Sequence, residues 1–406
     1  MRLTIERLGH LGDGIAPGAV YVPRALPGEE VEGDRVGDTI PAPQIVTPSP
    51  DRVAPPCPHY ASCGGCALQH ASDRFVADWK VGVVRAALDA QGLSTLFRPI
   101  LTSPPQSRRR AALAGRRTKK TVILGFHGRA SDSVVAVPGC RLLHPGLMAA
   151  FPALQALVAA GSSRNGIVSL TVTHSDAGPD VAVTGGKPLD GALRLSLAQV
   201  VEAGGIARLT WGDEVVALRR PPGQHFGAAR VVPPPGAFLQ ATAEGEAALL
   251  DAVTEAVGDA RRVADLFAGC GTFTLPLAAR AEVHAIEGEA AMLAALDRGW
   301  RGAEGLKRVT TETRDLFRRP LLAEELKGFD AIVIDPPRAG AEAQVAELAR
   351  AALPVIAMVS CNPVTFARDA RRLADSGYRL DWVQVVDQFR WSAHVEVAAR
   401  FTLIGR

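Results

Sequence analysis

The sequence predicts a mixed α/β protein in three parts: a small all-β module, a central α+β domain and a parallel sheet covered by helices. The 406 residues suffice for roughly two to three domains, each burying its own core. Proline-rich segments at 40–58 and 231–236 separate regions of different pattern. After the second, strands and helices alternate to about residue 377, which is typical of a parallel sheet. We therefore expect domains at 1–50, 51–235 and 236–406.

The composition is that of a globular protein, with 47% hydrophobic and 21% charged residues. No apolar run reaches the roughly 18 residues that a membrane span needs. The first residues, MRLTIERLGHLGDG, carry charges where a secretory signal needs apolar residues. We therefore expect a cytoplasmic protein.

The first two regions are predicted element by element. Short apolar stretches at 3–5, 19–22 and 30–31, separated by glycine turns, indicate short strands. Helical periodicity over 73–91 predicts a helix with Phe75 and Trp79 on one face. The central region is expected to hold strands at 121–126, 134–137 and 167–173, and a helix near 148–160. After the last helix, runs at 380–386 and 395–404 predict an antiparallel pair added to the C-terminal sheet.

A basic stretch lies in the central region. Although the net charge of the chain is only +3, residues 101–141 contain nine Lys and Arg against one acid, Asp132. The basic residues are Arg108, Arg109, Arg110, Arg116, Arg117, Lys119, Lys120, Arg129 and Arg141. This excess suits a phosphate backbone, although a solvated strand face has the same signature.

The C-terminal region begins with a glycine turn between a strand and a helix, Asp265-Leu-Phe-Ala-Gly-Cys-Gly-Thr272. Gly269 and Gly271 let the backbone pass close to a ligand. Glu287 ends the following strand, where it is placed to accept hydrogen bonds from two ribose hydroxyls. A dinucleotide or an adenosyl ligand fits this pattern. The loop lacks a third glycine, and Asp265 would repel a pyrophosphate but tolerate a cationic sulfonium.

Two further strand ends carry reactive side chains. One strand delivers Asp335-Pro-Pro-Arg338, and the next, 354–359, delivers Ser360-Cys361-Asn-Pro. Strand ends in open α/β sheets face the ligand crevice, so Asp335 and Cys361 are expected to meet there. A strand-end cysteine read alone is more often an inert core residue.

These motifs together resemble the RNA uracil-5-methyltransferase family, in particular its iron–sulfur-containing ribosomal RNA members. The matching segments are Gly236-Ala-Phe-Leu-Gln240, Asp265 to Pro276, Asp335-Pro-Pro-Arg-Ala-Gly340, Ser360 to Asp369 and His394-Val-Glu396. The resemblance implies a Rossmann-like class I methyltransferase domain and, as substrate, RNA, with 23S rRNA expected. The sequence carries no signal of oligomeric state, and a monomer is expected by default.

The resemblance implies roles for individual residues. Cys361 is the expected nucleophile and Glu396 the expected proton acceptor. The expected contacts to S-adenosylmethionine are Gln240, Phe267, Thr272, Glu287, Asp315 and Asp335. Phe238 and Gln240 are expected to border a flipped base.

The chemistry requires both catalytic groups. Carbon 5 of uracil is too weak a nucleophile to take a methyl group, but a thiolate added at carbon 6 turns the ring into an enolate. The adduct must then lose its carbon 5 proton to a base before the thiolate leaves.

The N-terminal part resembles the family's accessory features. Residues 9–16 and 22–29 resemble a TRAM domain, a small RNA-binding β-barrel. The chain has six cysteines, at 57, 63, 66, 140, 270 and 361, expected to be reduced thiols. The set Cys57, Cys63, Cys66 and Cys140 resembles the family's four cluster ligands. Four thiolates suit zinc or a 4Fe-4S cluster equally; only the resemblance favours the cluster.

One segment departs from the family pattern, because Phe389-Arg-Trp-Ser-Ala393 stands where Phe-Pro-x-Thr is usual.

Four other functions are compatible with parts of the sequence. A tRNA uracil-5-methyltransferase shares the motifs. A nucleotide-dependent iron–sulfur redox protein would need the third glycine. A non-enzymatic RNA-binding module would not depend on Cys361. An RNA cytosine-5-methyltransferase usually places its nucleophile in a Pro-Cys pair where this chain has Pro-Pro-Arg338.

Overall fold

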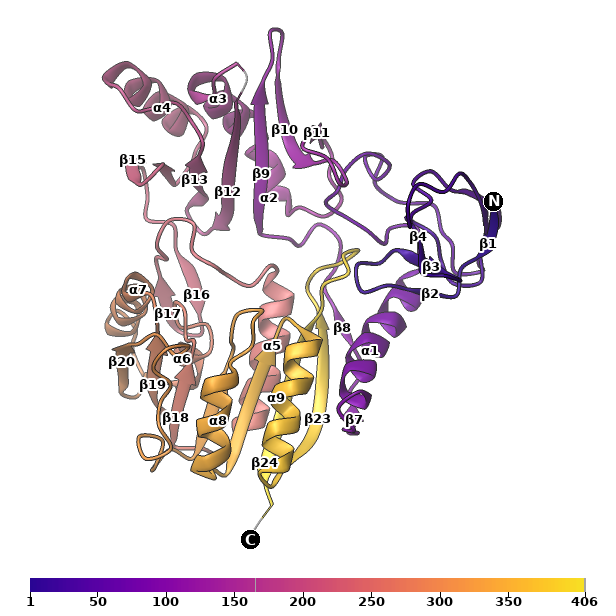
Figure 1. The fold of residues 1–406 in the computed structure, drawn as a ribbon. Coiled ribbons are helices and arrows are strands. Elements are labelled where there is room, and N and C mark those ends of the chain that lie inside the picture. The colour runs from indigo at the N-terminus through magenta and orange to yellow at the C-terminus, as the bar shows by residue number, and fades with distance from the viewer. Residues whose placement is uncertain (165, 405–406) are drawn as a thin grey trace.

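The computed structural model describes residues 1–164 and 166–404, which form three parts (Figure 1). The N-terminal part is the expected all-β module, made of two three-stranded antiparallel sheets around a small apolar core that includes Ile5, Val22 and Ile40. Its closure as a TRAM-like barrel stays a prediction. One sheet holds β1 (Arg2–Thr4), β5 (Glu30–Glu32) and β6 (Gln44–Thr47), and the other β2 (Arg7–Leu8), β3 (Gly14–Ala16) and β4 (Val20–Val22).

The central part is a seven-stranded sheet on which helices α3 and α4 pack. The expected central strands and helix are confirmed to within a few residues. In sheet order the strands are β11 (Val134–Ala136), β10 (Val122–His127), β9 (Arg110–Arg117), β12 (Ile167–Ser175), β13 (Gly178–Thr184), β14 (Arg208–Trp211) and β15 (Glu214–Leu218); the helices are α2 (Pro145–Ala149), α3 (Phe151–Gly161) and α4 (Gly191–Ala203). A short hairpin, β16 (Gln224–Phe226) and β17 (Ala229–Val231), leads into the next part.

The C-terminal part is built on a nine-stranded sheet. Its parallel strands are β20 (Val309–Thr313), β19 (Glu282–Glu287), β18 (Arg262–Leu266), β21 (Ala331–Ile334) and β22 (Val355–Ser360). The predicted antiparallel pair is confirmed: β24 (Glu396–Leu403) lies between β22 and β23 (Tyr378–Asp387) and runs antiparallel to both. This arrangement places the carboxyl ends of the five parallel strands at one edge.

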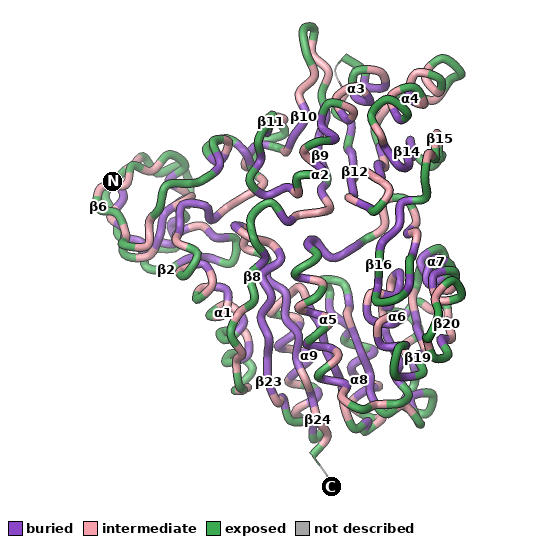
Figure 2. The backbone as a smooth tube through the Cα atoms, turned by 180° about the vertical axis from the view of Figure 1, so that it is seen from behind, coloured by how far each residue is buried: buried purple, intermediate pink, exposed green. Residues whose placement is uncertain are grey.

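Helices cover both faces of this sheet, so its central strands β18, β21 and β22 are largely buried (Figure 2). Because side chains alternate along a strand, Val263 packs on one face and Ala264 on the other. The first face is covered by α5 (Ala243–Val257), α6 (Thr274–Leu277) and α7 (Ala290–Arg301), and the second by α1 (Asp73–Asp89), α8 (Glu342–Ala351) and α9 (Pro363–Asp375). Among the described helices, none has both the length and the apolar composition to cross a bilayer.

Residues 73–102 pack on the C-terminal sheet, although the predicted division assigns them to the central domain. The predicted helix is present as α1, capped by Ser72, and it contacts α9 and β23. Two short strands after it, β7 (Leu96–Phe97) and β8 (Leu101–Thr102), pair in parallel with β23. The chain therefore adds strands to the C-terminal sheet before it forms the central one, a long-range pairing that local sequence pattern does not encode.

A buried ion pair fastens α1 to the sheet. The Lys80 ammonium lies 2.5 Å from a carboxylate oxygen of Asp387, and the two side chains are 0% and 2% exposed. The Lys80 ammonium also donates to the carbonyl of Phe389 at 3.2 Å. Removing one partner of such a pair leaves an uncompensated buried charge.

We expect Lys80→Met to lower the free energy of unfolding by about 3 to 5 kcal/mol, because the Asp387 carboxylate then stays buried without its cation. Urea denaturation followed by circular dichroism measures this change. Arg74→Ala is the matched control on the same helix, since Arg74 pairs with Asp78 while 92% exposed and should leave the transition nearly unchanged. Equal midpoints for the two variants would contradict the assignment of Lys80.

Candidate active site

A cavity of about 490 Å³ opens at the carboxyl edge of the nine-stranded sheet. Its size is within the range of small-molecule sites. All eight residues predicted as cofactor contacts or catalytic groups line it: Gln240, Phe267, Thr272, Glu287, Asp315, Asp335, Cys361 and Glu396. The topology thus brings together side chains from five separate sequence motifs.

The glycine turn after β18 forms the floor of this cavity. Phe267, Gly269 and Gly271 have φ values of +64°, +55° and +94°, so the chain turns sharply here. A Cβ added to Gly271 would lie 2.8 Å from Leu296, so close packing also requires glycine there. Glu287 reaches across from β19 and accepts a hydrogen bond from the Gly269 amide at 3.0 Å. The carboxylate expected to hold a ribose is therefore fixed against the loop.

The charge of the cavity is strongly acidic. Its described lining contains four carboxyl groups and one guanidinium, Arg338. Burial and the charge of Asp265 raise the pKa of Asp335 to about 7. Asp265 is wholly buried and does not line the cavity. Its carboxylate accepts a hydrogen bond from the Thr274 hydroxyl at 2.5 Å. Such a lining suits a ligand with positive charge and disfavours a pyrophosphate.

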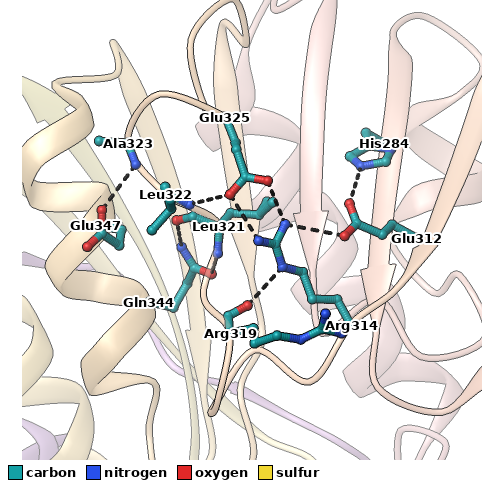
Figure 3. Close-up of polar contacts among 10 residues, drawn as sticks. All are labelled: His284, Glu312, Arg314, Arg319, Leu321, Leu322, Ala323, Glu325, Gln344 and Glu347. Atoms are coloured by element: carbon teal, nitrogen blue, oxygen red, sulfur yellow. Dashed lines mark hydrogen bonds and ion pairs between the residues drawn. The ribbon is translucent and has the colours of Figure 1, made fainter.

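Asp315 comes from a loop that is held by a polar network (Figure 3). The Arg314 guanidinium donates to both oxygens of Glu325, at 2.8 and 3.0 Å, and to the Arg319 carbonyl. The wholly buried Gln344 on α8 exchanges two hydrogen bonds with the backbone of Leu321. These contacts hold the segment after β20 against the sheet, which fixes the Asp315 carboxylate at the cavity.

Phe317 also lines the cavity and was not among the predicted residues. Its ring is 49% exposed and its centroid lies 5.5 Å from that of Phe267. Two aromatic rings at the mouth of a cavity suit a planar ligand group. The only sequence signal was an aromatic residue two positions after Asp315.

Cys361 lies at the cavity as predicted, half-buried, between β22 and the N-terminus of α9. Asn362 caps α9 by accepting from the Val364 amide, and its side-chain nitrogen donates to the Arg338 carbonyl at 2.9 Å. Burial and the charges of Glu396 and Asp335 raise the pKa of the Cys361 thiol to about 11. The guanidinium of Arg338 and the positive end of α9 act in the opposite direction.

Glu396 opens β24 and is 3% exposed. Burial and the charge of Asp335 raise the pKa of its carboxyl group to about 8. A carboxyl group with a pKa in this range exchanges protons readily near neutral pH, as a general base must. In the altered segment 389–393, which precedes it, the Trp391 carbonyl accepts hydrogen bonds from the amides of Ala67 and Leu68.

Part of the basic stretch makes contacts within the protein. Arg109 forms a 2.5 Å ion pair with Glu246 and donates to the Gln240 carbonyl. Arg110 donates to the carbonyls of residues 236 and 237. These arginines therefore hold the loop that carries Phe238 and Gln240.

Four other cations of this stretch lie at the tip of the β9–β10 hairpin, which projects from the central part (Figure 1). They are Arg116, Arg117, Lys119 and Lys120. None of them forms an ion pair with any residue that the structure describes. At roughly 3.4 Å per residue, the strand carries the tip about 24 Å beyond Arg110.

Cys57, Cys63, Cys66 and Cys140 line one small cavity of about 10 Å³, together with Tyr60 and Gln69. All four are free thiols, so the donor set has the chemistry of a thiolate metal site. Within residues 1–164 and 166–404, however, no group of three or more Cys, His, Asp or Glu side chains is arranged to hold one metal ion. The four predicted ligands therefore lie around one cavity, but a metal site there stays a prediction.

Known proteins resemble this chain in both sequence and fold. Residues 233–402 match the family tRNA (Uracil-5-)-methyltransferase. The chain is 45% identical to an uncharacterized RNA methyltransferase of Mesorhizobium japonicum, over 98% of this chain and 97% of that protein. It is 34% identical to the 23S rRNA (uracil(1939)-C(5))-methyltransferase RlmD of Nitrosococcus oceani, over 98% and 95%.

A solved structure shares the overall fold. The tRNA (uracil-54, C5)-methyltransferase of Pyrococcus abyssi, in complex with S-adenosyl-L-homocysteine, superposes with a TM-score of 0.77 over 99% of each chain, at 23% identity. The likeness at that identity concerns the fold, which is that of a class I methyltransferase.

Proposed function

The chain belongs to the RNA (uracil-5-)-methyltransferase family, whose members use S-adenosylmethionine, and from this premise we propose that it methylates carbon 5 of one uridine in 23S rRNA through a covalent adduct with Cys361. The observation that carries the proposal is that Cys361 and Glu396 line the same acidic cavity as the six expected cofactor contacts. Because one chain supplies all of these residues, we infer that it acts as a monomer.

The two catalytic groups account for every bond change. S-adenosylmethionine supplies an electrophilic methyl group. The Cys361 thiolate would add to carbon 6 of the uracil and push an electron pair toward carbon 5. Carbon 5 would then bond to the methyl carbon as the bond from that carbon to the sulfonium sulfur breaks, which leaves S-adenosylhomocysteine. Glu396 then takes the carbon 5 proton, the double bond re-forms, and the thiolate leaves. Phe238, 58% exposed at the cavity, is placed to stack on a base extruded from the RNA.

The expected cofactor contacts divide by chemistry. Glu287 would accept from the ribose hydroxyls and Asp315 from the adenine amine, while Phe267 would supply an aromatic face; all three line the cavity. Asp335 and the other carboxyl groups favour the sulfonium charge electrostatically. This acidity counts against the alternative of a dinucleotide-dependent redox protein.

Identity of the RNA rests on the relatives. The relative that is 34% identical over nearly the whole chain is named for 23S rRNA, whereas the tRNA enzyme is similar in fold. Incubation of the purified protein with S-adenosylmethionine and either RNA, followed by nucleoside mass spectrometry, tests the assignment. We expect 5-methyluridine in unmodified 23S rRNA fragments. Its appearance in tRNA alone would move the assignment to the tRNA alternative.

We also propose that Cys57, Cys63, Cys66 and Cys140 hold a 4Fe-4S cluster and that the N-terminal module is a TRAM-like RNA-binding barrel. In a cubane each thiolate binds a different iron, so the sulfur atoms need not converge on one point as they do around zinc. Protein purified without oxygen is expected to be brown and to contain about four iron atoms per chain. Colourless protein with one zinc ion would contradict this assignment and leave the methylation proposal intact.

The hairpin tip is expected to bind RNA phosphates at a distance from the reaction. We predict that replacing Arg116, Arg117, Lys119 and Lys120 with Gln reduces the salt-dependence slope of RNA binding by about 3, since each phosphate contact to a single strand contributes about 0.7. Filter binding of the 23S fragment from low to high salt measures the slope.

The matched control for the hairpin is the triple variant Arg301→Gln, Lys307→Gln and Arg308→Gln, which removes exposed cations near the amino end of β20, opposite the cavity. It is expected to leave the slope unchanged. Equal slopes for the hairpin variant and the wild type would show that the tip is only a solvated surface.

A further inference from the structure

Gln388 directly follows β23 and is 1% exposed. Its side-chain nitrogen donates to the side-chain oxygen of Gln240 at 2.6 Å, and its oxygen accepts from the Ala241 amide at 2.7 Å. Glu396 is a close neighbour, because Val386 pairs with Glu396 across β23 and β24 and Gln388 follows two residues later. A primary amide has two N–H donors and one oxygen, so one N–H remains for Glu396 after the bonds to Gln240 and Ala241.

The surroundings hold this amide in one place. The preceding residue, Asp387, is fixed by Lys80 through its carboxylate and by the Ser103 amide through its carbonyl. On the other side, a Cβ added to Gly245 of α5 would lie 2.5 Å from the Gln388 Cβ, so glycine there permits the close approach. The position is therefore built around the amide and not merely occupied by it.

From these contacts we propose that Gln388 is a positioning residue, which aims the Glu396 carboxylate at carbon 5 of the adduct and joins the base to the Phe238–Gln240 loop that borders the nucleotide. This inference rests on the proposed function. An N–H that faces a carboxylate also stabilises its charged form, so the Gln388 amide lowers the pKa of Glu396 relative to the effect of burial alone.

The groups that face Glu396 set the background for any pH effect. Asp335 raises the pKa of Glu396 and Arg338 lowers it, while Cys361 and His394 are the other titratable neighbours. Because Glu396 acts as a carboxylate, proton removal is slow below its pKa and reaches a plateau above it. The rate should therefore rise with pH up to the pKa of Glu396, and this rising part of the pH–rate profile is called the pH limb below. Loss of the Gln388 donor is expected to move the pH limb to higher pH.

The test compares Gln388→Met, which keeps the volume, with Gln388→Glu, which keeps the acceptor for Ala241 but lacks the donors. Both are expected to lower kcat for RNA methylation by about 10- to 100-fold, within the range for misplaced acid–base groups. Both are also expected to shift the pH–rate limb upward. Covalent trapping by 5-fluorouracil RNA should fall far less, since it stops before proton removal.

Gln384→Met is the matched control, because Gln384 is a buried amide on the same strand whose side chain donates to the carbonyls of Pro99 and Val385, away from the cavity. It should leave the pH limb in place. A wild-type limb in both Gln388 variants, or parallel losses of turnover, trapping and thermal stability, would overturn the inference. Wild-type protein that forms no fluorouracil adduct would instead refute the proposed function itself.

Discussion

Replacing the nucleophile, Cys361→Ala, is expected to reduce RNA methylation by on the order of 10⁴-fold or more, the scale seen when a covalent catalyst loses its nucleophile. The reason is chemical, because without addition at carbon 6 the uracil ring has no enolate to attack the methyl group. Transfer of radiolabelled methyl groups from S-adenosylmethionine to 23S rRNA fragments, measured under multiple-turnover conditions, gives the ratio.

Binding of S-adenosylmethionine is the internal control for this variant. Alanine removes only the sulfur, and the expected ribose and adenine contacts, Glu287 and Asp315, come from the end of β19 and the loop after β20. Calorimetry should therefore find affinity within a few-fold of the wild type. Methylation that survives in Cys361→Ala would exclude the covalent mechanism and favour a different catalytic mechanism.

Replacing the base, Glu396→Gln, is expected to slow turnover by about 10²- to 10⁴-fold while leaving the earlier steps in place. The methylated adduct then cannot lose its carbon 5 proton, so it should accumulate on ordinary uracil RNA as a protein–RNA band that survives denaturation. The wild type releases its product and should show no such band. A variant that turns over slowly without accumulating an adduct would assign Glu396 to an earlier step.

The pH dependence of the wild type follows from the same residue. The raised pKa of Glu396, about 8, means that the carboxylate form increases with pH up to that value. Proton removal should therefore rise about tenfold per pH unit below pH 8 and level off above it, if this step limits turnover. In Glu396→Gln this rise of the rate with pH should disappear. Single-turnover rates measured from pH 6 to 9 would show its loss.

Much of the cavity was predictable because strand ends carry its side chains. In a parallel sheet, a short motif at the end of each buried strand is enough to place Asp335 and Cys361 at one edge. Glu287 was placed by the same rule, at the end of β19. Glu396 required the family resemblance, because β24 begins with it and runs antiparallel to its neighbours.

What the sequence did not reveal depends on long-range contacts. The pairing of residues 96–102 with β23 joins segments almost 300 positions apart, and no local periodicity encodes it. The roles of Arg109 and Arg110 could not be predicted from charge alone, since their partners are a carboxylate and backbone carbonyls that are distant in the sequence. Gln388 has no motif around it, and only its three partners reveal its place.

The most direct test of covalent catalysis by Cys361 is to locate the covalent bond itself. Wild-type protein is incubated with S-adenosylmethionine and 23S rRNA containing 5-fluorouracil, then digested and examined by tandem mass spectrometry. We expect a peptide in which Cys361 carries one fluoropyrimidine nucleotide with one added methyl group. A nucleotide attached to another residue such as Cys270, or no attached nucleotide at all, would contradict it.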